Sequence, residues 1–455
     1  MAIETKNPAT GEILKTYNRY SSQELDKILD RSKSAFCDWK LTTFDERKKI
    51  MQKVAHLLRE RREEYARLIT IEIGCPISQA YSEIEKCAFI TEIFAEEAEK
   101  MLSKEIIDYN TKEAYISFEP LGTILHIAPW NYPFYLVLRP VIPAMMAGNT
   151  VIMKHASNVP QTSLAIQKLF IDGGLLDGVF QSILATSSQM NDIIEDDRIE
   201  MVALIGSENA GKAVASEASS HIKKTVMELG GSDPFIVFPN CDLKVAAENA
   251  AYSRMRNAGQ SCNAAKRFVV HKDVVVEFTK LFSQEVAKEI IGDPTKKETT
   301  MGPLATIGQL LEVERQVSES INMGAKVEMG GKRVQNTQGF FYEPTILSNV
   351  SKGMPAYDEE VFGPVAPIIT FDSVDEAIKI ANDTRYGLGA SIWTKDEELA
   401  KSLIPRIEAG NVYINTVVRG NPKLPFGGIK KSGYGREFGE YGIKEFVNIK
   451  SVVIQ

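Results

Sequence analysis

Cysteine and histidine are scarce in this chain, and their placement excludes two kinds of protein. The 455 residues contain five cysteines spread without a close pair, so a disulfide framework like that of small secreted domains is not expected. The five histidines do not pair with cysteine or acid at metal-ligand spacing, and we therefore expect no metal site. The cysteines are Cys37, Cys75, Cys87, Cys241 and Cys262.

Long apolar runs and clusters of basic residues are missing as well. No apolar run reaches the ~18 residues needed to cross a bilayer, and residues 1–6 lack the hydrophobic core of a signal peptide. The net charge is −7, and no stripe of Lys and Arg is interleaved with aromatic residues. These absences predict a cytoplasmic protein that binds neither membranes nor nucleic acid.

The chain instead alternates helical patterns with short apolar runs. With 44% hydrophobic residues it can bury a large core, and its length predicts two or three domains. Short buried strands between helices are typical of a parallel, doubly wound sheet, and the series restarts after Pro234, which predicts a second α/β domain. The expected strands lie at 122–128, 150–154, 179–184, 201–205, 235–238, 267–271, 390–393 and 411–415. The expected helices lie at 22–38, 44–70, 77–103, 161–171, 242–258, 274–289, 307–323, 373–383 and 396–408.

The most informative segment is residues 257–265, where Cys262 stands alone among small residues. Gly259 and Ser261 leave room for backbone amides and a closely approaching substrate, as a nucleophilic thiol requires. Upstream, Glu228 is set against apolar residues and two glycines, where burial would raise its basicity. A reactive thiol with a semi-buried acid predicts covalent catalysis followed by hydrolysis. The alternative is that Cys262 is one more buried small hydrophobic residue.

Five motifs occur in an order that closely resembles the aldehyde dehydrogenase superfamily, and most of all its short succinate-semialdehyde dehydrogenases. They are Pro129–Pro133 (PWNYP), Glu228–Gly231 (ELGG), Gly259–Cys262 (GQSC), Glu359–Pro364 (EEVFGP) and Pro425–Gly433 (PFGGIKKSG). The resemblance runs from Asn7 to the C-terminus. It implies an α/β fold with a Rossmann-like NAD(P)-binding domain at 1–103 and 121–230, a catalytic α/β domain at 231–442, and a small β oligomerisation element at 104–120 and 443–455.

The resemblance also implies three catalytic roles. Cys262 would attack the aldehyde, and the side-chain amide of Asn131 would bind the resulting oxyanion together with the backbone amide of Cys262. Glu228 would then activate the water that hydrolyses the thioester, which disfavours a CoA-acylating variant. The alternatives are a turn-forming asparagine at 131 and a salt-bridged acid at 228.

Eight residues are expected at the cofactor. Gly206, Ser207 and Gly211 lie where a strand turns into a helix, a place that suits a pyrophosphate, although a plain turn would look the same. Superfamily members place a lysine and often a glutamate at the adenosine ribose; here these positions hold Lys154 and the neutral Ser157. Lys154 would then offer an unopposed charge to a 2′-phosphate, so NADP is predicted to be preferred, with NAD possible. The remaining three are Trp130, Glu360 and Phe362.

Two arginines match positions that bind the remote carboxylate in succinate-semialdehyde dehydrogenases. Arg139 and Arg256 could each make two charge-assisted bonds to it, or each could pair with an internal acid instead. The serine that the family often adds is missing from residues 416–424, where Arg419 or Asn421 could replace it. The resemblance thus implies NADP-preferring oxidation of succinate semialdehyde in a homodimer or homotetramer that contacts through residues 105–119 and 443–455.

Other functions stay open on the sequence alone. The chain could be a broader dehydrogenase of small aldehydes such as lactaldehyde, glyceraldehyde or glutarate semialdehyde. It could also be a cysteine hydrolase without redox chemistry, although no histidine lies near Cys262 in the sequence. A binding protein without catalysis is disfavoured because Asn131, Glu228 and Cys262 are all present.

Overall fold

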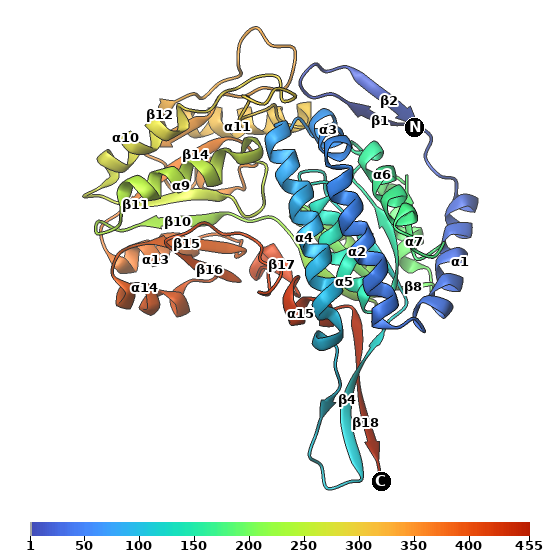
Figure 1. Cartoon of the computed structure of the whole chain (residues 1–455). Helices are drawn as coiled ribbons and strands as arrows, with labels where there is room; N and C mark the ends of the chain where they lie inside the picture. Colours follow the sequence, from blue (N-terminus) through green and yellow to red (C-terminus); the bar gives the residue numbers. More distant parts are fainter. Residues whose placement is uncertain (1) are drawn as a thin grey trace.

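Two open sheets form the frame of the molecule in the computed structural model, which describes residues 2–455 (Figure 1). The first sheet has six strands in the order β17-β9-β8-β5-β6-β7, and all neighbours except β17 and β9 run parallel. Its strands are β5 (Thr123–Ile127), β6 (Thr150–Lys154), β7 (Phe180–Ile183), β8 (Ile199–Ile205), β9 (Lys224–Glu228) and β17 (Gly433–Tyr434). The strands expected at 122–128, 150–154, 179–184 and 201–205 are confirmed.

Helices cover both faces of this sheet. Leu125 and Ile152 face one helix layer, whereas their neighbours Ile124 and Val151 face the other, as the two-residue period of a strand requires. The first layer consists of α1 (Ser22–Trp39), α7 (Met190–Glu195) and α8 (Glu208–Ser220). The second contains α5 (Tyr135–Met146) and α6 (Pro160–Asp172), with α2 (Phe44–Glu60), α3 (Arg62–Ile73) and α4 (Ile77–Met101) packed against them. The predicted doubly wound arrangement is confirmed.

The second sheet has seven strands in the order β12-β13-β14-β11-β10-β15-β16, antiparallel only between β12 and β13. Phe235 and Phe268 face α9 and α10, whereas Ile236 and Val269 face α13 and α14. The strands are β10 (Asp233–Val237), β11 (Ala265–His271), β12 (Lys326–Met329), β13 (Thr345–Ser348), β14 (Val365–Phe371), β15 (Gly389–Trp393) and β16 (Asn411–Ile414). The helices are α9 (Leu243–Met255), α10 (Val275–Val286), α11 (Ile307–Asn322), α12 (Pro355–Asp358), α13 (Val374–Asn382) and α14 (Glu397–Leu403).

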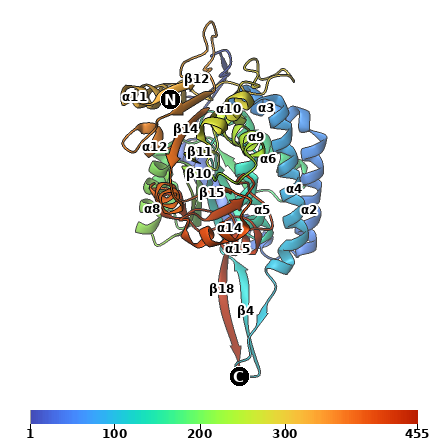
Figure 2. The same cartoon turned by 90° about the vertical axis from the view of Figure 1, so that its left-hand side faces the viewer.

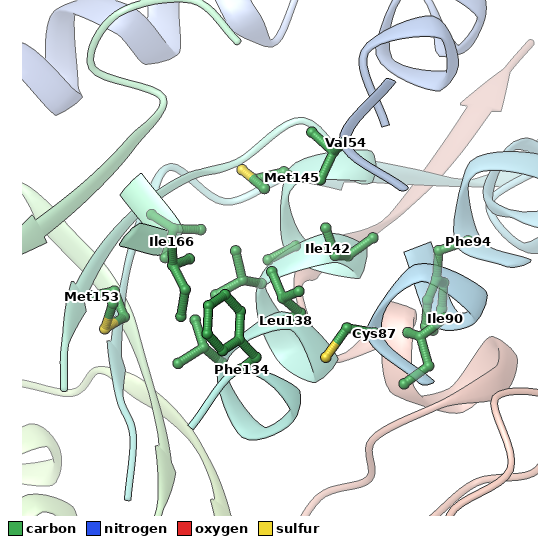
Figure 3. Close-up of a cluster of buried hydrophobic side chains, with 14 of the residues drawn as sticks. Val54, Cys87, Ile90, Phe94, Phe134, Leu138, Ile142, Met145, Met153 and Ile166 are labelled. Carbon is green, nitrogen blue, oxygen red and sulfur yellow. The ribbon is translucent and has the colours of Figure 1, made fainter. Parts of the chain in front are cut away.

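Several helix boundaries differ from the expected ones. The helix predicted at 44–70 is two helices, α2 (Phe44–Glu60) and α3 (Arg62–Ile73), because the backbone leaves the helical region at Arg61. The helix predicted at 396–408 ends as α14 at Leu403. Helix α5 was not expected, because Pro140 and Pro143 lie inside it. This helix is central to the core, and Figure 3 shows Phe134, Leu138 and Ile142 packed near Cys87 and Ile90 of α4.

A long arm projects from the body, as both views show (Figures 1 and 2). In it β4 (Glu113–Pro120) pairs along its whole length with β18 (Val447–Ile454), and β3 (Glu105–Ile106) adds a short third strand. The segments 105–119 and 443–455, both expected at a subunit contact, thus pair with each other within one chain. A hairpin of β1 (Ile3–Lys6) and β2 (Ile13–Tyr17) was not expected. Across residues 2–455 the structure holds no helix of the length and apolarity that a bilayer crossing requires.

Candidate active site

The loop before Cys262 is a strained turn held by one buried arginine. Asn257 and Ala258 both have φ of 51°, a left-handed conformation that is rare for residues with a side chain. Arg254 at the end of α9 donates to the carbonyl oxygens of Gly259 (2.5 Å), Gly363 (2.7 Å) and Ala265 (3.2 Å). These hydrogen bonds fix the loop that carries Cys262 and leads into β11.

Asn131 is tied to the same loop. Its Nδ2 donates to the Gln260 carbonyl oxygen at 3.1 Å, and Asn257 Nδ2 donates to the Asn131 carbonyl oxygen at 2.8 Å. Asn131 is only 4% exposed. An amide nitrogen has two hydrogens, so one donor of Asn131 remains beyond the bond to Gln260. These two hydrogen bonds therefore fix the segment Pro129–Pro133, which follows β5, to the loop that carries Cys262.

Glu228, the last residue of β9, is buried beside the Cys262 thiol. Neither of its carboxylate oxygens has a hydrogen-bond partner among residues 2–455. Burial raises the pKa of Glu228, and the positive charge of Arg139 opposes that rise. Burial and the adjacent Glu228 carboxylate also raise the pKa of the Cys262 thiol well above its usual range, while Arg139 and Lys266 lower it. A thiol and a carboxyl of raised basicity in contact are suited to exchanging a proton.

Arg139 lies between two buried acids. Its Nη2 is 3.4 Å from Glu228 Oε2 and forms a closer ion pair with Glu437 Oε2. Burial raises the pKa of Glu437 to about 7 despite the neighbouring guanidinium. The rings of Phe426 and Phe438 enclose the cation. The structure thus places Arg139 at the site, but it pairs this arginine with internal acids, as the alternative interpretation required.

Arg256 has no acidic partner within ion-pair distance among residues 2–455. Its guanidinium lies over the Tyr132 ring at 5.2 Å, and Nη1 donates to the Tyr252 hydroxyl at 3.2 Å. Lys86 of α4 adds a second positive charge near it: burial and then Arg256 lower the pKa of Lys86 to about 8, the buried acid Glu83 opposes this change, and Arg419 has a smaller effect. The surroundings of Arg256 therefore favour an anion.

Lys154, at the end of β6, is a buried cation without a counterion. It is 8% exposed, and within residues 2–455 it forms no ion pair and its ammonium group makes no hydrogen bond. Burial lowers its pKa. Ser157, three residues later, is exposed and brings no negative charge. An unpaired buried lysine is costly unless a ligand supplies the opposite charge, so this edge of the first sheet fits a phosphate.

The turn after β8 also fits a nucleotide. Gly206 N donates to the Glu228 carbonyl oxygen at 3.0 Å, and Ser207 caps α8 by accepting from Ala210 N at 3.3 Å. At Gly211 the structure shows a packing reason for glycine, because a Cβ there would lie 2.6 Å from Leu229 Cδ1. The N-terminal end of α8 can therefore bind part of a nucleotide, whereas a contact between Gly211 itself and the cofactor remains a prediction.

Glu360 and Phe362 connect the two sheets. The Phe362 ring meets Trp130 edge to face at 5.8 Å. Glu360 Oε1 accepts from Gly231 N at 3.1 Å and pairs with Lys266 Nζ at 3.1 Å. Gly230 leaves room for this carboxylate, since a Cβ there would lie 2.2 Å from Glu360 Oε2 and would displace it. The segments that carry Cys262, Glu228 and Glu360 thus meet at one point.

Comparison with known proteins identifies the family. The chain matches the sequence model of the Aldehyde dehydrogenase family over residues 1–452. It belongs to that family. This aldehyde dehydrogenase is 44% identical, over the whole of both chains, to succinate-semialdehyde dehydrogenase (NADP(+)) 1 of Mycobacterium tuberculosis. It is 43% identical, over 99% of both chains, to an aldehyde dehydrogenase of Paenarthrobacter nicotinovorans.

Solved structures agree with this assignment. Succinic semialdehyde dehydrogenase from Streptococcus pyogenes, in complex with NADP+ as the cofactor, superimposes with a TM-score of 0.97 at 35% identity, and both chains are covered completely. All these relatives of the aldehyde dehydrogenase are dehydrogenases. The interpretation as a cysteine hydrolase without redox chemistry receives no support from them.

Three residues of this aldehyde dehydrogenase site were missed from the sequence. Arg254, Lys266 and Glu437 are all buried and all contact residues that were predicted. Lys266 and Arg254 lie close to Cys262 in the sequence, so their proximity to its loop could have been predicted. Their burial was not, because it depends on strands far away in the chain. Glu437 lies outside the five motifs and gave no signal.

One surface group departs from the expectation for histidine. Glu217 of α8 lies one turn before His221, the residue that follows the helix. The distance from Glu217 Oε1 to His221 Nε2 is 3.3 Å, and Glu195 lies close to both. The statement that no histidine pairs with an acid at ligand spacing was therefore wrong. Exposed acidic groups of this kind are common without an ion, and this one lies outside the site, so it carries no metal assignment.

Proposed function

We propose that this aldehyde dehydrogenase oxidises succinate semialdehyde to succinate and prefers NADP over NAD. The names of the relatives from Mycobacterium tuberculosis and Streptococcus pyogenes support both the substrate and the cofactor. The observation that carries the proposal is the arrangement of charge: the Cys262 thiol lies beside the buried Glu228 carboxyl, Arg256 lies over the ring of Tyr132 next to Asn131 in the sequence, and Lys154 has no counterion among residues 2–455.

The reaction begins at Cys262. Its sulfur attacks the aldehyde carbon, and the thiol proton passes to Glu228, whose raised basicity makes it a suitable acceptor. The negative charge that develops on the aldehyde oxygen is stabilised by the free hydrogen of the Asn131 amide and by the Cys262 backbone amide. When bound, NADP supplies the oxidising nicotinamide that converts the thiohemiacetal to a thioester.

Glu228 completes the turnover. Glu228 first releases the thiol proton to solvent; its carboxylate then takes a proton from a water that attacks the thioester carbon, and it returns that proton to the departing Cys262 sulfur as the acid is released. Both carboxylate oxygens lack partners within residues 2–455, so a water can be accepted without breaking an existing bond. Arg139 holds the carboxylate in place and limits the rise of its pKa.

The cofactor contacts follow from the same charges. Lys154 would hold the 2′-phosphate, and Ser157 would donate a hydrogen bond where a glutamate would repel. Gly206, Ser207 and Gly211 would lie at the pyrophosphate, and Trp130, Glu360 and Phe362 at the nicotinamide end. A single phosphate suits a buried lysine that has no other partner.

Arg256 would be the main ligand of the substrate's remote carboxylate, because it has no competing acid. Arg139 would be a second ligand whose guanidinium is shared with Glu437. The carboxylate of Glu437 therefore competes with the substrate carboxylate for this guanidinium. Arg419 is held by Thr416 Oγ1 at 2.8 Å and would add a longer-range attraction in place of the missing serine.

A broader range of small aldehydes is the second candidate. The absent serine favours it, because one directional contact to the carboxylate is lost. Lactaldehyde, glyceraldehyde and glutarate semialdehyde would then compete with succinate semialdehyde.

We also propose a homodimer or homotetramer that assembles through the arm. β18 is an edge strand, and its outer backbone groups have no partner within residues 2–455. An unpaired strand edge is a template for pairing with a second chain. The domain boundaries given above and a cytoplasmic location stay predictions.

The test follows reduced-cofactor absorbance with a panel of aldehydes. Succinate semialdehyde with NADP should give the highest kcat/KM, and Cys262→Ala should remove activity. Cys37→Ala is the matched control, since Cys37 is an exposed free cysteine far from the site in sequence. Full activity of Cys262→Ala would end the proposed mechanism, whereas a higher kcat/KM with glyceraldehyde would favour the broader range.

A further inference from the structure

Lys266 is a buried charge that the proposed reaction does not use. It is the second residue of β11, and its side chain is 1% exposed. Nζ donates to the Cys262 carbonyl oxygen at 2.5 Å and lies 3.1 Å from Glu360 Oε1. A buried ammonium group is retained only where such partners compensate for its lost hydration.

These contacts join three segments that are far apart in the chain. Glu360 Oε1 also accepts from Gly231 N, so Lys266 is connected through Glu360 to the turn that follows Glu228. One ammonium group therefore bridges the nucleophile loop and the Glu360 loop, with the Glu228 turn one bond away. No exposed lysine could do this, because water would compete for every bond.

We propose that Lys266 is a positioning residue that fixes the backbone of the Cys262 loop, holds Glu360, and places a positive charge beside the thiol. The inference rests on the proposed role of Cys262 as the nucleophile. It adds a residue that couples the nucleophile to the loop expected at the nicotinamide ribose.

The charged groups around the thiol make the charge effect measurable. Glu228 of β9, Arg139 of α5 and Lys266 of β11 face Cys262, Glu437 is paired with Arg139, and Glu360 and Asp233 lie close to Lys266. Arg139 is already engaged by two acids. Removal of Lys266 would leave Arg139 as the principal cation near the sulfur, so formation of the thiolate should become harder.

The experiment measures the pH dependence of Cys262 alkylation by iodoacetamide, read at the Cys262 peptide by mass spectrometry, with neither aldehyde nor nucleotide present. Lys266→Met should move the midpoint upward by about one pH unit, which makes alkylation about tenfold slower below it. Glu360→Gln should move the midpoint in the opposite direction, because it leaves the charge of Lys266 unopposed. Lys266→Arg keeps the positive charge and should leave the midpoint close to that of the unaltered protein.

The opposite directions separate charge from structure. A purely structural lysine would give the same direction of change in Lys266→Met and Glu360→Gln, and that result, or an unmoved midpoint in Lys266→Met, would overturn the proposal. Lys272→Met and Asp372→Asn are the matched controls, an exposed ion pair just beyond the same strand, and should leave the midpoint unchanged. Because no aldehyde is present, a negative result leaves the proposed oxidation standing; that proposal fails on Cys262→Ala instead.

Discussion

The thiol pocket and the nucleotide edge treat charge in opposite ways. In the thiol pocket, formed by Cys262, Glu228, Arg139 and Glu437, every charged group faces a group of opposite sign inside the protein. At the nucleotide edge, formed by Lys154, Ser157 and the turn after β8, the buried lysine has no partner among the described residues. The charges of the thiol pocket are neutralised within the protein before any ligand binds, whereas the charge of Lys154 is left to be neutralised by a ligand.

This difference predicts two kinds of mutational effect. A change in the pocket should slow the reaction with every aldehyde and either cofactor, because it alters groups that act on the reacting carbon. A change at the edge should alter the choice of cofactor and leave the chemistry intact. The four predictions below test this division, beginning with the largest expected effect.

Glu228→Gln should separate the two halves of the reaction. The amide cannot take a proton from water, so steady-state turnover should fall by about 10²–10⁴, while one equivalent of NADPH still forms in a burst that is slower than in the unaltered enzyme, because Glu228 also accepts the thiol proton. Rapid mixing followed by absorbance measures both phases. Turnover like that of the unaltered enzyme would remove Glu228 as the base and would weaken the contrast between pocket and edge.

Asn131→Ala should lower kcat/KM by about 10²–10³, equivalent to roughly 3–4 kcal/mol of lost oxyanion stabilisation. The loss should be the same for succinate semialdehyde and propanal, since both develop the same oxyanion. A loss confined to one aldehyde would mean that Asn131 contacts the substrate tail instead. Circular dichroism checks that the tie to Gln260 is not needed for folding.

Arg256→Ala and Arg139→Ala should sharpen the boundary of the pocket. Arg256→Ala should raise KM for succinate semialdehyde by about 10- to 100-fold, the value of a charge-assisted hydrogen bond, and leave propanal unchanged. Arg139→Ala should raise the same KM but also slow propanal, because Glu228 loses its neighbouring cation. If both variants affect the two aldehydes equally, neither arginine reads the carboxylate.

Ser157→Glu should show the smallest effect and the most selective one. A carboxylate near Lys154 would repel the 2′-phosphate, so kcat/KM with NADP should fall by about tenfold while that with NAD is retained. Ser157→Ala is the control and should change both cofactors little. If the unaltered enzyme already prefers NAD, the inference from the missing carboxylate is wrong.

The sequence predicted the elements better than the contacts between them. Apolar runs such as residues 150–154 are local signals, and they became strands at the expected places. Helix α5 was missed because Pro140 and Pro143 mask its pattern, although both lie in a buried helix that contacts α4. The partners of Arg139 could not be predicted, since Glu437 is far from it in the sequence and meets it only in the folded chain.

The arm also sets a condition on how the protein is made. Its pairing joins segments that are far apart in the chain, as in the contact between Lys450 and Glu119, which are 331 residues apart. Until β18 has been synthesised, β4 has only the short strand β3 as a neighbour. A purification tag fused after Gln455 would extend from the tip of the arm.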